Sequence, residues 1–309
     1  MHGSFETDGR ELPRVLGFTD VMGILVGTVI GSGIFIVPAT IAGFVKSPGL
    51  LLAVWVVGGA LSFFGALAFS ELGAAFPQAG GMYVFLREAY GSLVAFLFGW
   101  ALFFVIDAGS IATLSMAFAS KYLPLFVTLG PVGTKAVAVS LIVLLVGVNY
   151  AGTRWGARVQ NVLMFIKFGA ILTVAGVSLI FGHGDMSHFV TPAEGPVAGG
   201  LVGGFGLALV ASLWAYKGWE AVSFSAGEIK DPERNLPLGL FIGTLLVIGL
   251  YLVTNVAYLY LFPVGQIATS TRIASDAMNV SVGPLGASLL GFVILLSITG
   301  AANGNVLTA

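Results

Sequence analysis

Four ionisable side chains lie away from the ends of long apolar stretches in this 309-residue sequence: Asp107, Lys167, Lys217 and Glu220. Charged groups inside a bilayer are costly, so they usually pair, face a bundle interior or mark a pathway for substrates, ions or protons. Asp107 is either a polar group satisfied by neighbouring helices or a pathway residue. Lys217 and Glu220 are three residues apart, so on a helix they either pair or leave Lys217 free to contact a substrate.

Composition places these side chains in an integral membrane protein surrounded by lipid bilayer. The chain is 57% hydrophobic and 9% charged, with a mean hydropathy of +1.01, whereas a soluble domain carries about 25% charged residues. A net charge of −1 without a basic run argues against binding to nucleic acid. The chain has no Cys, and its three His lie outside the apolar stretches, so we expect neither a metal site nor a cofactor.

Eight segments are long and apolar enough to cross a bilayer, which takes about 20 residues. They cover residues 17–44, 49–76, 92–118, 132–152, 157–182, 200–226, 237–262 and 284–309. The eighth segment runs to Ala309 without a flanking charge, so we expect a longer protein cut at or within its eighth helix.

Positive charges in the connecting segments indicate the orientation of the chain. Seven Lys and Arg fall on the side of the N-terminus and four on the opposite side: Arg10, Arg14, Arg87, Arg154, Arg158, Lys230 and Arg234 against Lys46, Lys121, Lys135 and Arg272. The positive-inside rule therefore predicts a multi-pass protein of the cell membrane with residues 1–16 in the cytoplasm.

The first apolar segment is interrupted by weak helix formers in GTVIGSGIFIVP, residues 27–38. Glycines four residues apart account for part of this run as helix packing, but they do not account for Ser32 and Gly33. Two half-helices meeting inside the membrane would do so, because irregular backbone is tolerated there only where it lines a protein-enclosed cavity. The N–H end of such a break attracts an anion and the carbonyl end a cation, and a free amino acid carries one of each.

A second break is expected in the sixth segment. Lys217 and Gly218 interrupt the apolar run about midway, between Trp214 and Trp219. Transporters built from inverted repeats have interrupted helices at corresponding places in their two halves. We therefore expect residues 17–182 to form a first repeat of five helices and residues 200–309 to form three helices of a second.

These stretches resemble the amino acid–polyamine–organocation superfamily, in the branch of the L-type amino acid transporters and their bacterial relatives. The resemblance is carried by VGTVIGSGIFIVP in the first segment, ELGAAFPQAGGMYVFLREAYG after the second and WAYKGWEAVSFSAGEIKDPERNLP in the sixth, and it extends over the chain from about residue 14. It implies an all-α integral membrane fold of five-plus-five inverted repeats with broken first and sixth helices, here with eight transmembrane helices.

The resemblance also implies a substrate site at the two breaks. Backbone N–H groups of the GSG stretch would hold the substrate carboxylate, carbonyls of both breaks would hold its ammonium group, and the aromatic ring at position 214 would cap the site. The residues concerned are Val29, Gly31, Ser32, Gly33, Ile34, Trp214 and Lys217. Lys217 departs from the relatives, which often carry a small or acidic residue at that position.

Lys167 lies about halfway along the fifth segment. In resembling sodium-independent members a Lys in this region occupies the place where sodium-coupled relatives bind the ion, which implies sodium independence here. Lys167 would then be a fixed cation bridging to the first break, or a proton carrier. The alternative is a Lys bound to carbonyls or to Asp107 that only holds the bundle together.

The expected function is secondary active transport of amino acids by alternating access, as an exchanger or a proton-coupled carrier. Polyamines or other organic amines are the alternative substrates. Animal L-type members use a Cys near residues 119–132 to bond an accessory glycoprotein, and this chain has none, so we expect no disulfide-linked subunit. A membrane enzyme would need a nucleophile–base set or metal ligands, and a channel would need a repeated pore loop or ring-forming symmetry. The sequence contains neither pattern.

Overall fold

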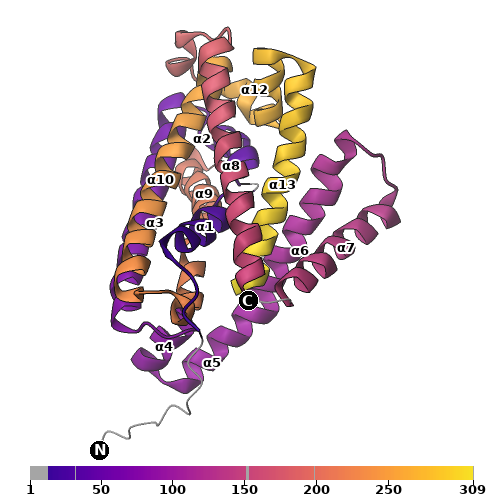
Figure 1. Cartoon of the computed structure of the whole chain (residues 1–309). Coiled ribbons are helices and arrows are strands. Elements are labelled where there is room, and N and C mark those ends of the chain that lie inside the picture. The colour runs from indigo at the N-terminus through magenta and orange to yellow at the C-terminus, as the bar shows by residue number, and fades with distance from the viewer. Residues whose placement is uncertain (1–12, 32, 151–152, 198, 309) are drawn as a thin grey trace, which may run out of the picture.

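The computed structural model describes residues 13–31, 33–150, 153–197 and 199–308 (Figure 1). The described residues are helical almost throughout and form no β-strand, only one bridge between Leu16 and Ile229. Within this described part of the chain, seven helices are long and apolar enough to cross a membrane, or eight if the bent pair α1 (Phe18–Val29) and α2 (Gly33–Val45) forms one span. The expected all-α membrane fold is confirmed.

The other spans follow the expected order. The second is α3 (Pro48–Ala75), and the third combines α5 (Ser92–Ala101), η1 (Leu102–Asp107), α6 (Ala108–Ala117), η2 (Phe118–Tyr122) and η3 (Leu123–Leu125). The fourth and fifth are α7 (Pro131–Tyr150) and α8 (Thr153–Phe181). The sixth is α9 (Gly200–Tyr216) with η5 (Trp219–Glu228), the seventh α10 (Pro232–Leu261) and the eighth α13 (Pro284–Thr308).

Two expected boundaries were wrong by several residues. The third span continues seven residues past its expected end, to Leu125. The seventh begins at Pro232 rather than at residue 237, because the turn is made by Asp231 (φ 45°) and proline fits the first position of a helix, where its missing N–H has no role.

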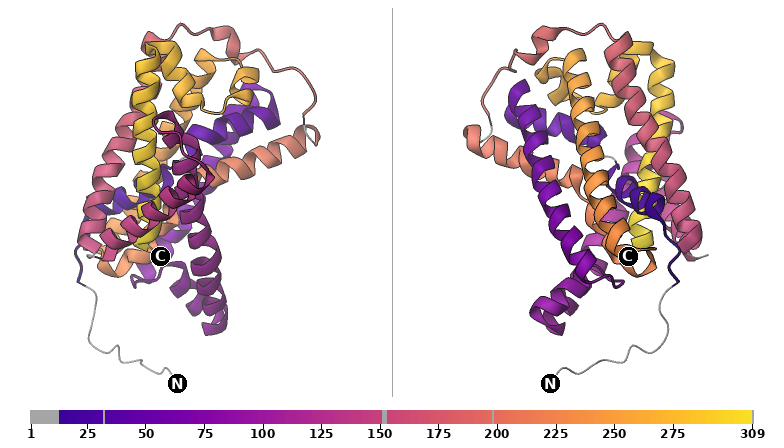
Figure 2. Two further views of the ribbon diagram at one scale, coloured as in Figure 1. Left: turned by 90° about the vertical axis from the view of Figure 1, so that its right-hand side faces the viewer. Right: turned by 60° about the vertical axis from the view of Figure 1, so that its left-hand side comes forward.

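Short helices mark the two ends of the bundle. α4 (Met82–Tyr90) lies at the lower end in Figure 1. α11 (Val264–Thr269), α12 (Ile273–Val282) and η4 (Met186–Phe189) lie at the opposite end, as Figure 2 shows from two further sides.

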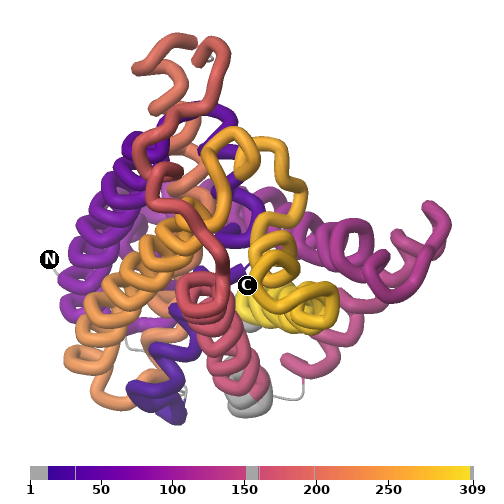
Figure 3. The backbone as a smooth tube through the Cα atoms, turned by 90° about the horizontal axis from the view of Figure 1, so that it is seen from above, coloured from indigo at the N-terminus to yellow at the C-terminus, as the bar shows by residue number. Residues whose placement is uncertain are grey.

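Helices of the first half pack against helices of the second half. α2 packs on α9, α1 on η5, α3 on α10, and α6 on α13. α8 contacts α1, α10 and α13, whereas α6 and α7 lie to one side of the bundle (Figure 3). These contacts do not test the division into residues 17–182 and 200–309, which stays a prediction.

Glycines let α1 approach its neighbours closely. A Cβ at Gly243 of α10 would lie 2.8 Å from Leu25, and a Cβ at Gly23 would overlap Asn161 of α8. Gly23 therefore has a packing role, because a larger side chain would separate α1 from α8.

The beginning of α1 is fastened to two other elements. The backbone N–H groups of Val15 and Leu16 both donate to the carbonyl of Glu228 at 2.9 Å, and Lys230 N–H donates to the Leu16 carbonyl at 2.8 Å. In addition, the Asn161 amide of α8 donates to Asp20 at 2.6 Å. These contacts position the half-helix that leads to the first break.

Candidate functional site

The first break separates α1, which ends at Val29, from α2, which begins at Gly33 after a bend of 40°. Ser32 lies outside the described residues. The N–H of Gly31 donates to the Val29 carbonyl at 2.9 Å instead of continuing the helical pattern. The first N–H groups of α2 have no preceding helical acceptor, so the start of α2 is suited to an anion.

The second break lies at the expected residues. α9 ends at Tyr216, Lys217 is extended (φ −61°, ψ 144°), and Gly218 has φ +121° before η5 begins. A Cβ at Gly218 would lie 3.0 Å from the side chain of Thr28 and 3.1 Å from its carbonyl carbon. Only glycine fits both this conformation and the close approach of the second break to the first.

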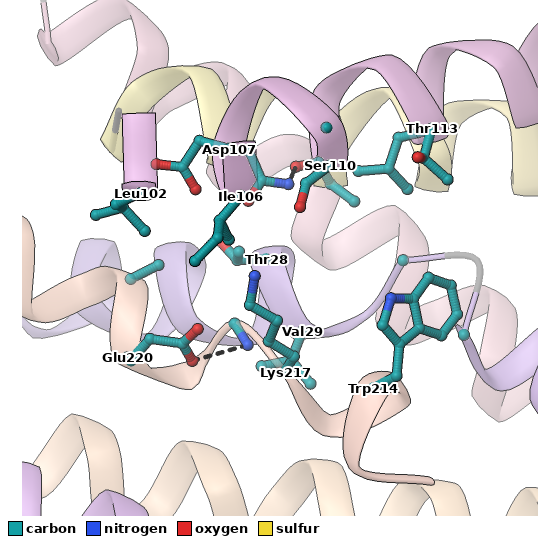
Figure 4. Close-up of a pocket in the computed structure, with 18 of the residues that line it drawn as sticks. Thr28, Val29, Leu102, Ile106, Asp107, Ser110, Thr113, Trp214, Lys217 and Glu220 are labelled. Atoms are coloured by element: carbon teal, nitrogen blue, oxygen red, sulfur yellow. Dashed lines mark hydrogen bonds between the residues drawn. The ribbon is translucent and has the colours of Figure 1, made fainter. Parts of the chain in front are cut away.

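A cavity of about 530 Å³ lies between the two breaks and the third span (Figure 4). Its size suits a small-molecule ligand. Seven of the sequence-predicted residues line it: Val29, Gly31, Gly33, Asp107, Trp214, Lys217 and Glu220. Ile34 is buried beside the break, and Lys167 is buried elsewhere, so neither lines the cavity.

Lys217 and Glu220 extend from one wall of the cavity, and Asp107 lies on the opposite wall (Figure 4). Glu220 accepts a hydrogen bond from the N–H of Gly218 at 3.0 Å. Among the described residues the one ion pair within 4 Å joins Arg87 to Glu88. Lys217 and Glu220 thus form no ion pair in this structure, and the exposed Lys217 side chain lines the cavity. A role of Lys217 in contacting a substrate stays a prediction.

Asp107 ends the π-helical turn η1 and shares its wall with Ser110 and Thr113. Such turns widen an α-helix locally and are frequent at functional sites. Among the described residues no hydrogen bond or ion pair to the Asp107 carboxylate is found, and its role as a pathway residue stays a prediction.

Lys167 is fully buried in α8 and reaches the first break from outside the cavity. Its ammonium donates to the carbonyl of Gly27 in α1. A Cβ at Gly300 of α13 would lie 2.9 Å from the same nitrogen, so three helices meet at this group. Lys167 and Asp107 form no ion pair. Its role as ion substitute or proton carrier stays a prediction.

Sequence reasoning missed Tyr251 of α10. Its hydroxyl oxygen lies 3.1 Å from the Val29 carbonyl and 3.3 Å from the Ala215 carbonyl, behind the cavity wall. A tyrosine inside a span rather than at the membrane interface, where tyrosines gather, is the signal that would have singled it out.

The carbonyls implied for the substrate ammonium already have donors. The Val29 carbonyl accepts from Gly31 and Tyr251, and the Trp214 carbonyl accepts from the N–H of Lys217 at 3.3 Å. A carbonyl has two acceptor positions. A substrate ammonium would therefore share the Val29 carbonyl with groups already bound to it.

A bundle of apolar helices with a cavity at two broken spans defines a class of membrane proteins that bind ligands between discontinuous helices. Residues 16–309 match the family described as "Amino acid permease", and the chain belongs to that family. The resemblance drawn from the motifs is confirmed.

Three relatives illustrate the similarity. The human b(0,+)-type amino acid transporter 1 is 34% identical over 312 residues, covering 99% of this chain and 63% of the relative. The serine/threonine exchanger SteT of Bacillus subtilis (strain 168) is 30% identical over 305 residues, covering 98% and 68%. The mouse Asc-type amino acid transporter 1 is 31% identical over 318 residues, covering 96% and 57%. The chain thus spans about 57% to 68% of their lengths.

Proposed function

We propose that the protein is a secondary active transporter that carries amino acids across the membrane by alternating access. The observation that carries the proposal is the cavity lined by residues of both helix breaks, Val29, Gly31 and Gly33 with Lys217 and Gly218. Helix breaks at membrane depth form substrate sites in transporters of this architecture. The family and the names of the relatives support the same function.

Amino acids fit this cavity better than polyamines do. The start of α2 offers N–H groups at Gly33, and the ends of α1 and α9 offer carbonyls, among them that of Val29. A free amino acid has a carboxylate for the first and an ammonium for the second. A polyamine would leave the N–H end without an anion.

A carrier is favoured over an enzyme or a channel. The relatives are named as amino acid transporters or as an exchanger, which supports a carrier. Uptake that saturates with substrate concentration would distinguish a carrier from a channel. The proposal includes a cytoplasmic N-terminus, and it needs no disulfide-linked accessory subunit because the chain has no Cys.

Transport is expected to be independent of sodium, because Lys167 supplies a fixed cation beside the first break. The test is uptake of a panel of radiolabelled amino acids into proteoliposomes under separate sodium and proton gradients. Sodium-driven accumulation would contradict the fixed-cation role. Uptake driven by a proton gradient would indicate a proton carrier, and uptake that only follows an internal amino acid would indicate exchange.

Lys217 is expected to make the wild type select against arginine and lysine, since its ammonium is exposed in the cavity without an ion-pair partner. Like charges a few Å apart at a partly enclosed site repel by a few kcal/mol. Lys217→Gln should therefore improve competition by arginine about tenfold relative to neutral amino acids.

The matched control for this measurement is Lys121→Gln, because Lys121 is exposed in η2 and does not line the cavity. Inhibition of uptake by arginine, compared with inhibition by a neutral amino acid, gives the ratio. Strong competition by arginine in the wild type would show that Glu220 cancels the charge or that Lys217 does not contact the substrate.

A further inference from the structure

Tyr251 contacts both broken spans from a position behind the cavity. Its side chain is fully buried, and it does not line the cavity. The hydroxyl lies within hydrogen-bonding distance of the carbonyls of Val29, the last residue of α1, and Ala215, the next-to-last residue of α9. Both of these residues line the cavity.

An aromatic cluster holds Tyr251 in this place. Its ring centre lies 5.5 Å from that of Trp55 and 5.2 Å from that of Tyr216. Tyr216 donates to the backbone carbonyl of Trp55 at 3.1 Å. The cluster joins α3, α9 and α10, so the Tyr251 hydroxyl is fixed relative to the helix that carries the second break.

The two carbonyls outnumber the protons that Tyr251 can supply. A phenol has one O–H donor, so Tyr251 serves Val29 or Ala215 at one time. The Val29 carbonyl also accepts from the N–H of Gly31, and it keeps one acceptor position open whenever Tyr251 donates to Ala215. When Tyr251 donates to Val29, the Ala215 carbonyl is left for another donor. Carbonyls at helix C-termini carry the negative end of the helix dipole and favour a cation. A substrate ammonium brings three N–H donors and a positive charge, which suits this pair of oxygens.

We propose that Tyr251 is a positioning residue that holds the Val29 and Ala215 carbonyls together as one binding wall for the ammonium group of the substrate. The assignment rests on the proposed function, because it presupposes an amino acid in the cavity. Tyr251 itself does not contact the substrate and acts through the two carbonyls.

The test compares Tyr251→Phe with Tyr258→Phe in the reconstituted protein. Tyr258 is a matched control, because it lies on the same helix, is equally buried and has a hydroxyl without a hydrogen-bond partner among the described residues. The competitors are the amino acid that inhibits uptake best and its α-hydroxy acid, for example L-alanine and L-lactate. This pair differs only in the group that the carbonyl wall would bind.

Tyr251→Phe is expected to raise the inhibition constant of the amino acid about tenfold, the usual effect of losing one hydrogen bond at a binding site. The inhibition constant of the α-hydroxy acid should change less than twofold. The KM for the amino acid should rise, whereas the maximal rate per folded protein should stay within about twofold of the wild-type value. Tyr258→Phe should leave every value unchanged.

If inhibition by both competitors weakens equally, or if only the maximal rate falls, the assignment is overturned, because Tyr251 then only supports the fold. No weakening at all would overturn it too. If the wild type binds no amino acid, the proposed function fails and the assignment fails with it, whereas the preceding outcomes leave amino acid transport intact.

Discussion

Gly33→Val is expected to reduce uptake by about 100-fold or more, the effect of displacing a binding group by about 1 Å. A Cβ at Gly33 would lie 2.9 Å from the Cα and 3.0 Å from the Cβ of Ala215. The start of α2 must then move away from α9 and carry its free N–H groups with it. The bulkier side chain would also crowd the approach of a carboxylate to the backbone.

Gly43→Val is the control for this substitution. Gly43 lies in the same helix, and a Cβ there would have no heavy atom within 4 Å. Uptake should be normalised to the amount of membrane-inserted protein, and both variants should insert as the wild type does. Equal transport by Gly33→Val and Gly43→Val would remove the carboxylate site from this stretch.

Lys167→Met is expected to lower uptake by about 10- to 100-fold. The Gly27 carbonyl lies in the last turn of α1, where its helical donor would be Gly31, but that N–H donates to Val29. Lys167 supplies the missing donor. Methionine fills a similar volume without an N–H, and leaving one buried acceptor unsatisfied costs about 1–3 kcal/mol.

The measurement is initial uptake by Lys167→Met beside Lys121→Met, in which an exposed lysine is lost. Thermal unfolding of both variants shows whether the loss comes from global stability. Wild-type uptake by Lys167→Met would mean that the contact with Gly27 has no part in transport.

Local sequence was enough to place both helix breaks, because glycine weakens a helix and interrupted backbone inside a membrane needs a protein-enclosed cavity. It was not enough to settle the partner of Lys217. The alternative in which Lys217 pairs with Glu220 assumed helical geometry, in which residues three apart are neighbours. Lys217 is extended at the end of α9, so the spacing rule does not apply, and Glu220 binds the N–H of Gly218.

Contacts between helices were beyond the reach of the sequence pattern. α9 and α10 are apolar on nearly all sides, so periodicity does not tell which face meets which neighbour. The contact of Gly33 with Ala215 and the position of Tyr251 behind both breaks depend on that choice. The same holds for Lys167, whose partner Gly27 lies 140 residues away in the chain.

The backbone hydrogen bonds between residues 15–16 and 228–230 have a mechanical consequence. They fasten the start of the first span to the end of the sixth, while α2 packs on α9 beyond the two breaks. A rotation about the breaks that keeps these bonds must move α1 and η5 together as one rigid unit. Because the bonds join backbone groups, substitution of Leu16 or Lys230 by proline, which lacks the N–H, removes one of them directly.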